Sequence, residues 1–147
     1  MADNTGLHLC IMSCFWDGLL QSVTDQDFQR LGLKLDLDSD RPRTPKKLIT
    51  WLKRHNTSFQ GSWDGQSFSR QQQRENREWI DSLDPSQSHN GYLCSSCDPV
   101  IALWCQLFQL EILHEYLGHS HRYLPSNNSS IRKIKFKNTR GHFVCVR

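Results

Sequence analysis

Long apolar segments are missing from this sequence. No stretch of its 147 residues approaches the roughly 18–20 consecutive apolar residues that a membrane-spanning helix requires. The first residues, MADNTGLHLCIMS, also lack the basic segment followed by a long apolar one that a secretory signal needs. We therefore expect a cytoplasmic protein with no membrane partner.

A large excess of charge is missing as well. The formal net charge is +3, which allows an acidic partner without requiring one. Hydrophobic residues make up only 37% of the chain, but five Trp and seven Phe supply bulk for a core. Because no repeat or low-complexity tract divides the sequence, we predict a single domain over residues 1–147.

Signs of an oxidising compartment are absent, although six cysteines are present. In a chain of this length without an export signal, reduced thiols are favoured over a disulfide framework. The reduced cysteines could then include a catalytic thiol or form a metal site. The cysteines are Cys10, Cys14, Cys94, Cys97, Cys105 and Cys145.

Apolar spacing predicts helices over most of the first 108 residues. The strongest begins with Asp98-Pro99, a capping residue followed by proline at the first helical position, and has a broad apolar face. We predict that it is the central core helix. The predicted helices begin at Cys14 behind a Ser13 cap, at Thr24 with an end at Gly32, at Pro45, at Arg70 with an end at Leu83, and at Pro99.

After Gln109 the pattern changes to short segments rich in β-branched and aromatic residues, separated by turn residues. Strands are predicted over LEILHEYL (110–117), HRYL (121–124), IRKIKFKN (131–138) and HFVCVR (142–147). The fold class predicted is α+β, with a helical half packed on a small, mostly antiparallel carboxy-terminal sheet.

Cys14 is the first candidate for chemistry. If Ser13 caps the helix, the thiol stands in the first turn, where unpaired amides and the helix dipole stabilise a thiolate. The alternative is a small buried hydrophobe, which is a common role of cysteine. Cys10, Cys105 and Cys145 are expected to have that role.

A thiolate nucleophile needs a partner that transfers a proton, which is usually a histidine brought near by the fold. Of the seven histidines, His142 follows Gly141 at the start of the last predicted strand, which would hold its side chain rigidly at one edge of the sheet. We therefore pair Cys14 with His142 as candidate nucleophile and general base.

The combination of SCFWDGLL near the start with GHFVCV near the end resembles the ovarian-tumour (OTU) class of papain-like cysteine proteases, especially its compact viral members. In that class a Cys followed by aromatic residues opens a buried helix, and a His followed by an aromatic begins a late strand. The order of core elements is similar over most of the chain, while residue-level similarity is confined to the two motifs.

The resemblance implies a papain-like single domain that hydrolyses peptide or isopeptide bonds without a cofactor. Its implied partner is ubiquitin or a ubiquitin-like protein, cut after its C-terminal tail, with a viral polyprotein junction as a further substrate. The implied location is the host cytosol. Cys14 and His142 take the catalytic positions of the family.

Two positions depart from the family pattern. Ile11 stands where the family usually has an Asp, and Val144 stands where it often has an acidic residue. A Cys–His dyad is therefore expected, with Asn138 as the candidate to orient the ring. The amide of Cys14 and the region of Ile11 and Met12 are the candidate oxyanion donors.

Binding surfaces give weaker signals. Trp16 and Tyr92 are candidates to line an aromatic-walled substrate groove, although both residue types are common in cores. In IRKIKFKNTR, Lys133, Lys135 and Lys137 alternate to one face, but this strand lacks the aromatic platform that single-strand nucleic-acid binders use. We expect a solvated strand and no nucleic-acid partner.

A second function remains open. Cys94 and Cys97 have the spacing of a zinc knuckle, and His119 and His121 follow later in the chain. Together they predict, as the alternative, a non-catalytic interaction module stabilised by zinc. One CxxC pair without a second matching pair is a weak signal.

Overall fold

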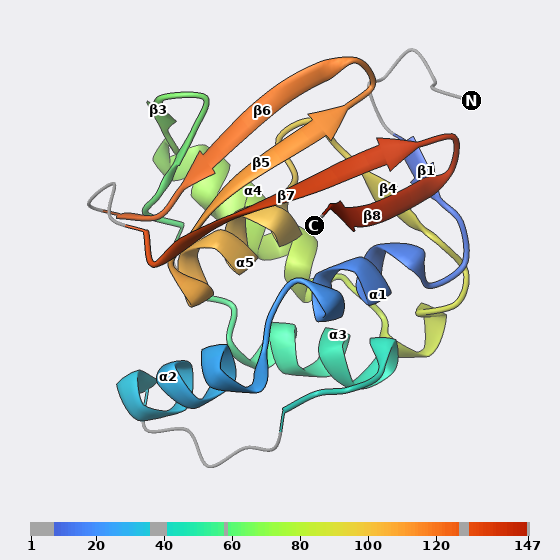
Figure 1. Cartoon of the computed structure of the whole chain (residues 1–147), viewed down its shortest axis with the longest axis horizontal. Helices are drawn as coiled ribbons and strands as arrows, with labels where there is room; N and C mark the ends of the chain where they lie inside the picture. Colours follow the sequence, from blue (N-terminus) through green and yellow to red (C-terminus); the bar gives the residue numbers. More distant parts are fainter. Residues whose placement is uncertain (1–7, 36–40, 58, 127–129, 147) are drawn as a thin grey trace.

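The computed structural model describes residues 8–35, 41–57, 59–126 and 130–146, and in this part of the chain five α-helices pack with a mixed β-sheet (Figure 1). The helices are α1 (Cys14–Gln21), α2 (Asp25–Leu35), α3 (Pro45–Arg54), α4 (Arg70–Asp81) and α5 (Pro99–Phe108), with a 3-10 turn η1 (Pro85–Gln87). The strands are β1 (His8–Cys10), β2 (Ser62–Trp63), β3 (Gln66–Ser67), β4 (Tyr92–Cys94), β5 (Leu110–Tyr116), β6 (His119–Leu124), β7 (Arg132–Thr139) and β8 (His142–Val146). None of the described helices is both long and apolar enough to cross a bilayer.

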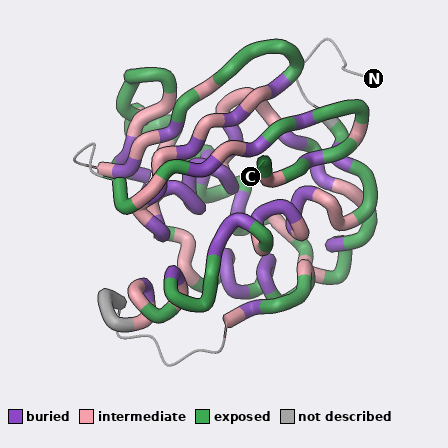
Figure 2. The backbone as a smooth tube through the Cα atoms, viewed as in Figure 1, coloured by how far each residue is buried: buried purple, intermediate pink, exposed green. Residues whose placement is uncertain are grey.

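The main sheet has the strand order β3-β2-β6-β5-β7-β8, and β1 and β4 form a separate antiparallel ribbon. Along β5 and β7 buried residues alternate with more exposed ones, so one face of the sheet is covered and the other is open (Figure 2). The helices gather on the covered side (Figure 1). The predicted α+β class is confirmed.

The predicted sheet is correct, but some strands were missed. All four predicted carboxy-terminal strands are present, and the main sheet is mostly antiparallel as predicted, with β5 and β7 as its parallel pair among the described residues. The strands β1 to β4 were not predicted, since two or three residues are too few to show a period of two.

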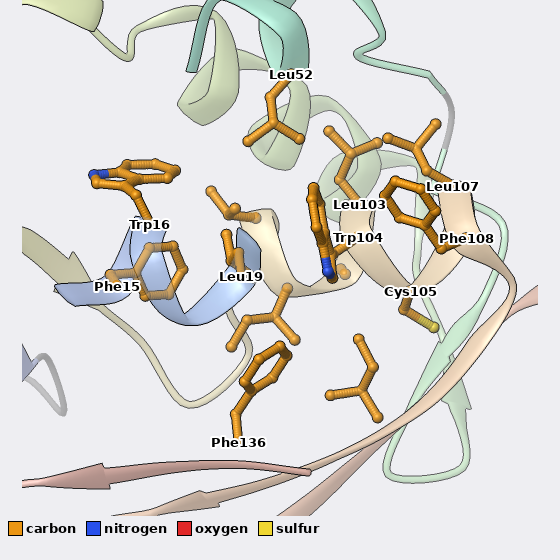
Figure 3. Packing of buried hydrophobic residues seen from close by; sticks show 14 of the residues in the cluster. Phe15, Trp16, Leu19, Leu52, Leu103, Trp104, Cys105, Leu107, Phe108 and Phe136 are labelled. Atoms are coloured by element: carbon orange, nitrogen blue, oxygen red, sulfur yellow. The ribbon is translucent and has the colours of Figure 1, made fainter. Parts of the chain in front are cut away.

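Helix α5 is the centre of the core, as predicted. Eight of its ten residues are buried, which leaves almost no solvent-facing side. Figure 3 shows Trp104 of this helix between Leu19 of α1 and Phe108, with Phe136 of β7 lower in the view. Helix α5 contacts β5 and β6 of the sheet as well as α2 and α4, whereas α1 packs directly on β8.

The Asp98 cap of α5 connects three elements. Its carboxylate accepts hydrogen bonds from the amide of Val100 at 2.9 Å, the amide of Ser95 at 3.1 Å and the hydroxyl of Tyr92 at 2.9 Å. Its own amide donates to the hydroxyl of Tyr123 at 2.8 Å. Burial raises the pKa of Asp98 to about 6, so the side chain is ionised at neutral pH. The predicted cap is confirmed and also links β4 and β6 to the core helix.

One predicted capping bond and one predicted helix end are wrong. Helix α1 begins at Cys14 with Ser13 before it, as predicted, but the hydroxyl of Ser13 donates to Asp17 at 2.8 Å and makes no capping bond. Gly32 does not end α2, which continues to Leu35. A glycine inside a helix costs only about 1 kcal/mol relative to alanine, and the packing of α2 on α5 can offset that cost.

Candidate active site

The amino-terminal end of α1 packs directly on β8. Gly18 permits the close approach, since a Cβ atom there would lie 2.6 Å from Cδ1 of Phe143. The rings of Phe15 and Phe143 lie with centroids 4.6 Å apart. This packing sets the first residue of α1 beside the start of β8, although the two are far apart in the sequence (Figure 1).

Cys14 is the first residue of α1, and it is half-buried. Its Sγ lies 3.6 Å from the carbonyl oxygen of Gly141. The same oxygen accepts a hydrogen bond from the amide of Ile11 at 2.7 Å. Because Gly141 directly precedes His142, the fold brings the two predicted motifs into contact.

His142 is exposed and begins β8, directly after a tight turn. Arg140 and Gly141 form this turn with φ values of 34° and 85°. Gly141 adopts its positive φ at no steric cost because it has no Cβ atom. In the described part of the chain, no hydrogen bond joins the ring of His142 to the Sγ of Cys14. The backbone before His142 contacts Cys14, but the side chain of His142 lies on the exposed face of β8, whereas Phe143 on the other face packs on α1.

An equivalent turn occurs elsewhere in the sheet. Leu117 and Gly118 have φ values of 50° and 85°, and His119 follows them as the first residue of β6. The two histidines therefore have the same local setting. The turn before His142 contacts the thiol of Cys14, and no such thiol contact of the turn before His119 occurs among the described residues. The local sequence does not reveal this difference.

The predicted lowering of the Cys14 pKa is wrong for the free protein. Burial is the largest influence and raises the pKa of the thiol, and nearby Asp17 raises it further. The backbone amides of Phe143 and Phe15 lower it, but by less. Cys14 is therefore a protonated thiol at neutral pH.

The candidate oxyanion region is a turn that is already hydrogen-bonded. The amide of Ile11 donates to Gly141, and the amide of Cys14 donates to the carbonyl of Ile11 at 3.3 Å. Both predicted donors are therefore engaged, because the chain turns back at this point. Met12 sits between them with a φ of 52° and 69% exposure, in a left-handed conformation that is uncommon for a non-glycine residue.

Asn138 does not orient His142, contrary to the prediction. The register of β7 and β8 places Asn138 opposite Phe143 on the buried face, and His142 opposite Thr139 on the exposed face. The Oδ1 of Asn138 lies 2.5 Å from Nε2 of His114 on β5. The pleat of the sheet thus separates the amide from the ring that it was expected to hold.

His114 is a buried residue that the sequence analysis did not place in the core. Leu110, Ile112, His114 and Tyr116 alternate along β5 and face the helices. This alternation was visible in LEILHEYL and could have identified it. Burial lowers the pKa of His114 to about 4, so its ring is neutral at pH 7.

Replacing His114 with glutamine is expected to change how stability depends on pH. The folded-state pKa lies below the unfolded value near 6.5, so the wild type loses stability as pH falls from 6.5 toward 4. Relative to His114→Gln, the wild type should lose about 2 kcal/mol of unfolding free energy between pH 7 and pH 5. Urea titrations of both proteins at the two pH values measure this difference, and a constant difference would contradict the buried neutral ring.

Trp16 and Tyr92 do not line a groove. They are 2% and 5% exposed, and their rings pack with Phe15 in the core. The apolar spacing of α1 and the inward face of β4 bury both side chains, so the prediction of a groove at these residues is wrong.

A different apolar surface lies beside the Cys14 turn. Leu9 and Leu93 stand opposite each other on the β1–β4 ribbon and are 49% and 44% exposed. Ile11 and Met12 continue this surface toward Gly141, which lies next to the side chain of Ile11. The sequence analysis did not select these four exposed apolar residues as a group.

The four residues of the zinc alternative do not gather at one point. Cys94 is fully buried, and Cys97 is half-buried with a pKa raised by burial to about 12. Nδ1 of His121 lies 2.7 Å from Asp64, whereas His119 is exposed. No group of three or more His, Cys, Asp or Glu side chains that could hold a metal ion occurs among the residues that the structure describes.

Comparison with known proteins gives no assignment. The chain matches no protein-family model, no curated protein and no solved structure. The argument about function therefore depends on the geometry of the chain's own residues.

Proposed function

We propose that this protein is a papain-like thiol hydrolase in which Cys14 is the nucleophile and His142 the general base. The observation that carries the proposal is the carbonyl of Gly141, which contacts the Sγ of Cys14 and immediately precedes His142. Cys14 also stands at the amino-terminal end of a helix, where free amide groups favour a developing thiolate.

The raised pKa of Cys14 determines the first chemical step. Because the resting thiol is protonated, the proposed mechanism requires the start of β8 to move as substrate binds, so that the ring of His142 reaches Sγ and accepts its proton. The thiolate then attacks the carbonyl carbon of the scissile bond. A burial-raised thiol pKa makes the reaction depend strongly on this base.

The remaining steps use the same two side chains. The tetrahedral intermediate collapses, the C–N bond breaks, and the imidazolium of His142 gives its proton to the leaving amine. A thioester on Cys14 remains. Water, deprotonated by His142, attacks the thioester and releases a carboxylate, and the thiol recovers its proton.

The proposed substrate is the C-terminal tail of ubiquitin or a ubiquitin-like protein, in an OTU-type activity exerted in the host cytosol. A viral polyprotein junction is the proposed further substrate. A protein substrate needs apolar contacts close to the reacting bond, and the exposed surface of Leu9, Ile11, Met12 and Leu93 offers them.

Covalent labelling tests the proposed nucleophile. Ubiquitin carrying a C-terminal electrophile is expected to form one adduct with the wild type and none with Cys14→Ala. Cys97→Ser is the matched control and should still form the adduct. The thiol of Cys97 is also half-buried, but burial raises its pKa to about 12, so we do not expect it to react with the electrophile. An adduct with Cys14→Ala would contradict the assignment of the nucleophile, and absence of a wild-type adduct would contradict a ubiquitin-directed activity.

A further inference from the structure

A cationic hollow lies at the beginning of α3, away from Cys14. Its volume is about 480 Å³, and its walls come from the segment before α3 and from one side of that helix. Lys47, Trp51 and Arg54 stand at helical spacings of four and three, so they share one face of α3. The residues used below are Arg41, Pro42, Lys46, Lys47, Trp51 and Arg54.

The charges around this hollow are not balanced. Lys46, Lys47 and Arg54 are exposed, and within the described ranges none of them forms an ion pair. Arg41 pairs with Asp25 at 2.7 Å, but no carboxylate lines the hollow itself. The aspartates of segment 36–40 lie outside the described residues. A bound anion would relieve the mutual repulsion of the cations.

Two hydrogen-bond donors at the same place lack an acceptor. In the described part of the chain, four buried polar side-chain atoms have no partner, and two of them, Nε1 of Trp51 and Nε of Arg41, belong to walls of this hollow. Both nitrogens are closed to solvent in the free chain, so they can donate to a ligand only after the wall of the hollow moves. A buried unpaired donor costs roughly 1–3 kcal/mol, and such groups call for a partner that the free chain does not supply.

We infer that this hollow is a binding site for a small organic phosphate. Lysine and arginine side chains and N–H donors match the oxygens of a phosphate group. Pro42 and the stems of the lysines give an apolar wall for the organic part of the ligand. The volume lies in the range usual for small-molecule sites.

Nucleic acid fits the hollow less well. A single strand is held by exposed aromatic rings on which bases stack, and the only aromatic residue here, Trp51, is buried against Phe28 and Phe108. The cations also extend over little more than two turns of one helix. The inference is independent of the thiol hydrolase proposal, because it uses none of the residues near Cys14.

A titration followed by NMR tests the site on the full chain. The probes are adenosine monophosphate and inorganic phosphate, added at about 150 mM salt, where exposed charges are largely screened. We expect a saturable shift of the Trp51 indole N–H signal, with tighter binding of the nucleotide than of phosphate. Absence of a shift at millimolar concentrations of both probes would overturn the inference.

Two double variants separate a site from general attraction. Lys47→Gln/Arg54→Gln should weaken nucleotide binding at least about tenfold, because two charge-assisted contacts are lost. Arg70→Gln/Arg74→Gln removes the same charge from the hollow on α4, which Glu78 and Asp81 also line, and should change binding less than twofold. All four side chains are exposed, so both variants should fold.

The remaining outcomes are equally decisive. Trp51→Phe keeps an aromatic ring but removes the unpartnered donor, and it should weaken binding several-fold while the amide spectrum stays that of a folded chain. Equal weakening by the two double variants would overturn the inference. So would tighter binding of a single-stranded oligonucleotide than of the nucleotide.

Discussion

The His142→Ala variant is expected to lose hydrolytic activity by about 10²–10⁴-fold in kcat/KM, the usual contribution of a positioned general base. The physical reason is the thiol itself. Burial and Asp17 raise the pKa of Cys14, so without a base only a small fraction of the protein carries the thiolate at neutral pH. Steady-state kinetics with a fluorogenic ubiquitin C-terminal amide measures the loss.

His119→Ala is the matched control for this prediction. His119 is exposed, begins a strand and follows a turn with nearly the same backbone angles, but the thiol of Cys14 lies at the other turn. Its replacement should leave kcat/KM within about twofold of the wild type, as expected for a surface substitution. An unchanged rate in His142→Ala, or the same loss in both variants, would contradict the role of His142.

The Asp98→Ala variant is expected to lose about 3–5 kcal/mol of unfolding free energy. The carboxylate of Asp98 is fully buried and accepts hydrogen bonds from the amides of Ser95, Val100 and Ile101 and from the hydroxyl of Tyr92. Alanine would leave these donors buried without an acceptor and remove the cap of the core helix. Urea unfolding followed by circular dichroism at pH 7 measures the loss.

Asp84→Ala provides the comparison for Asp98. Asp84 also precedes a proline and caps a helical turn, η1, by accepting from the amide of Ser86 at 2.9 Å. Asp84 is exposed, so water can replace the lost acceptor and the destabilisation should be far smaller. Equal losses in the two variants would contradict the view that burial, and not the cap alone, makes Asp98 important.

Local sequence signals predicted the elements that have strong periodicity or a specific cap. The Asp98-Pro99 start of α5 and its apolar face are correct, as are Thr44-Pro45 for α3 and the four carboxy-terminal strands. The end of α2 was missed, because a single glycine is a weak stop once packing stabilises the helix.

Site residues were harder to predict, because their roles depend on which face of an element they occupy. Asn138 seemed close to His142 in the sequence, but the pleat of β7 turns it toward His114. Trp16 and Tyr92 were placed at a groove although both lie in the core.

The sequence alone determined the α+β class, the core helix, and Cys14 and His142 as candidates for chemistry, since short-range periodicity and turn chemistry act between neighbouring residues. Only the tertiary structure decided which turn lies at the thiol, how burial raises the pKa of that thiol, and where unpaired cations gather around α3. Contacts between distant segments and exclusion of water produce these properties, and neither is encoded in the local pattern.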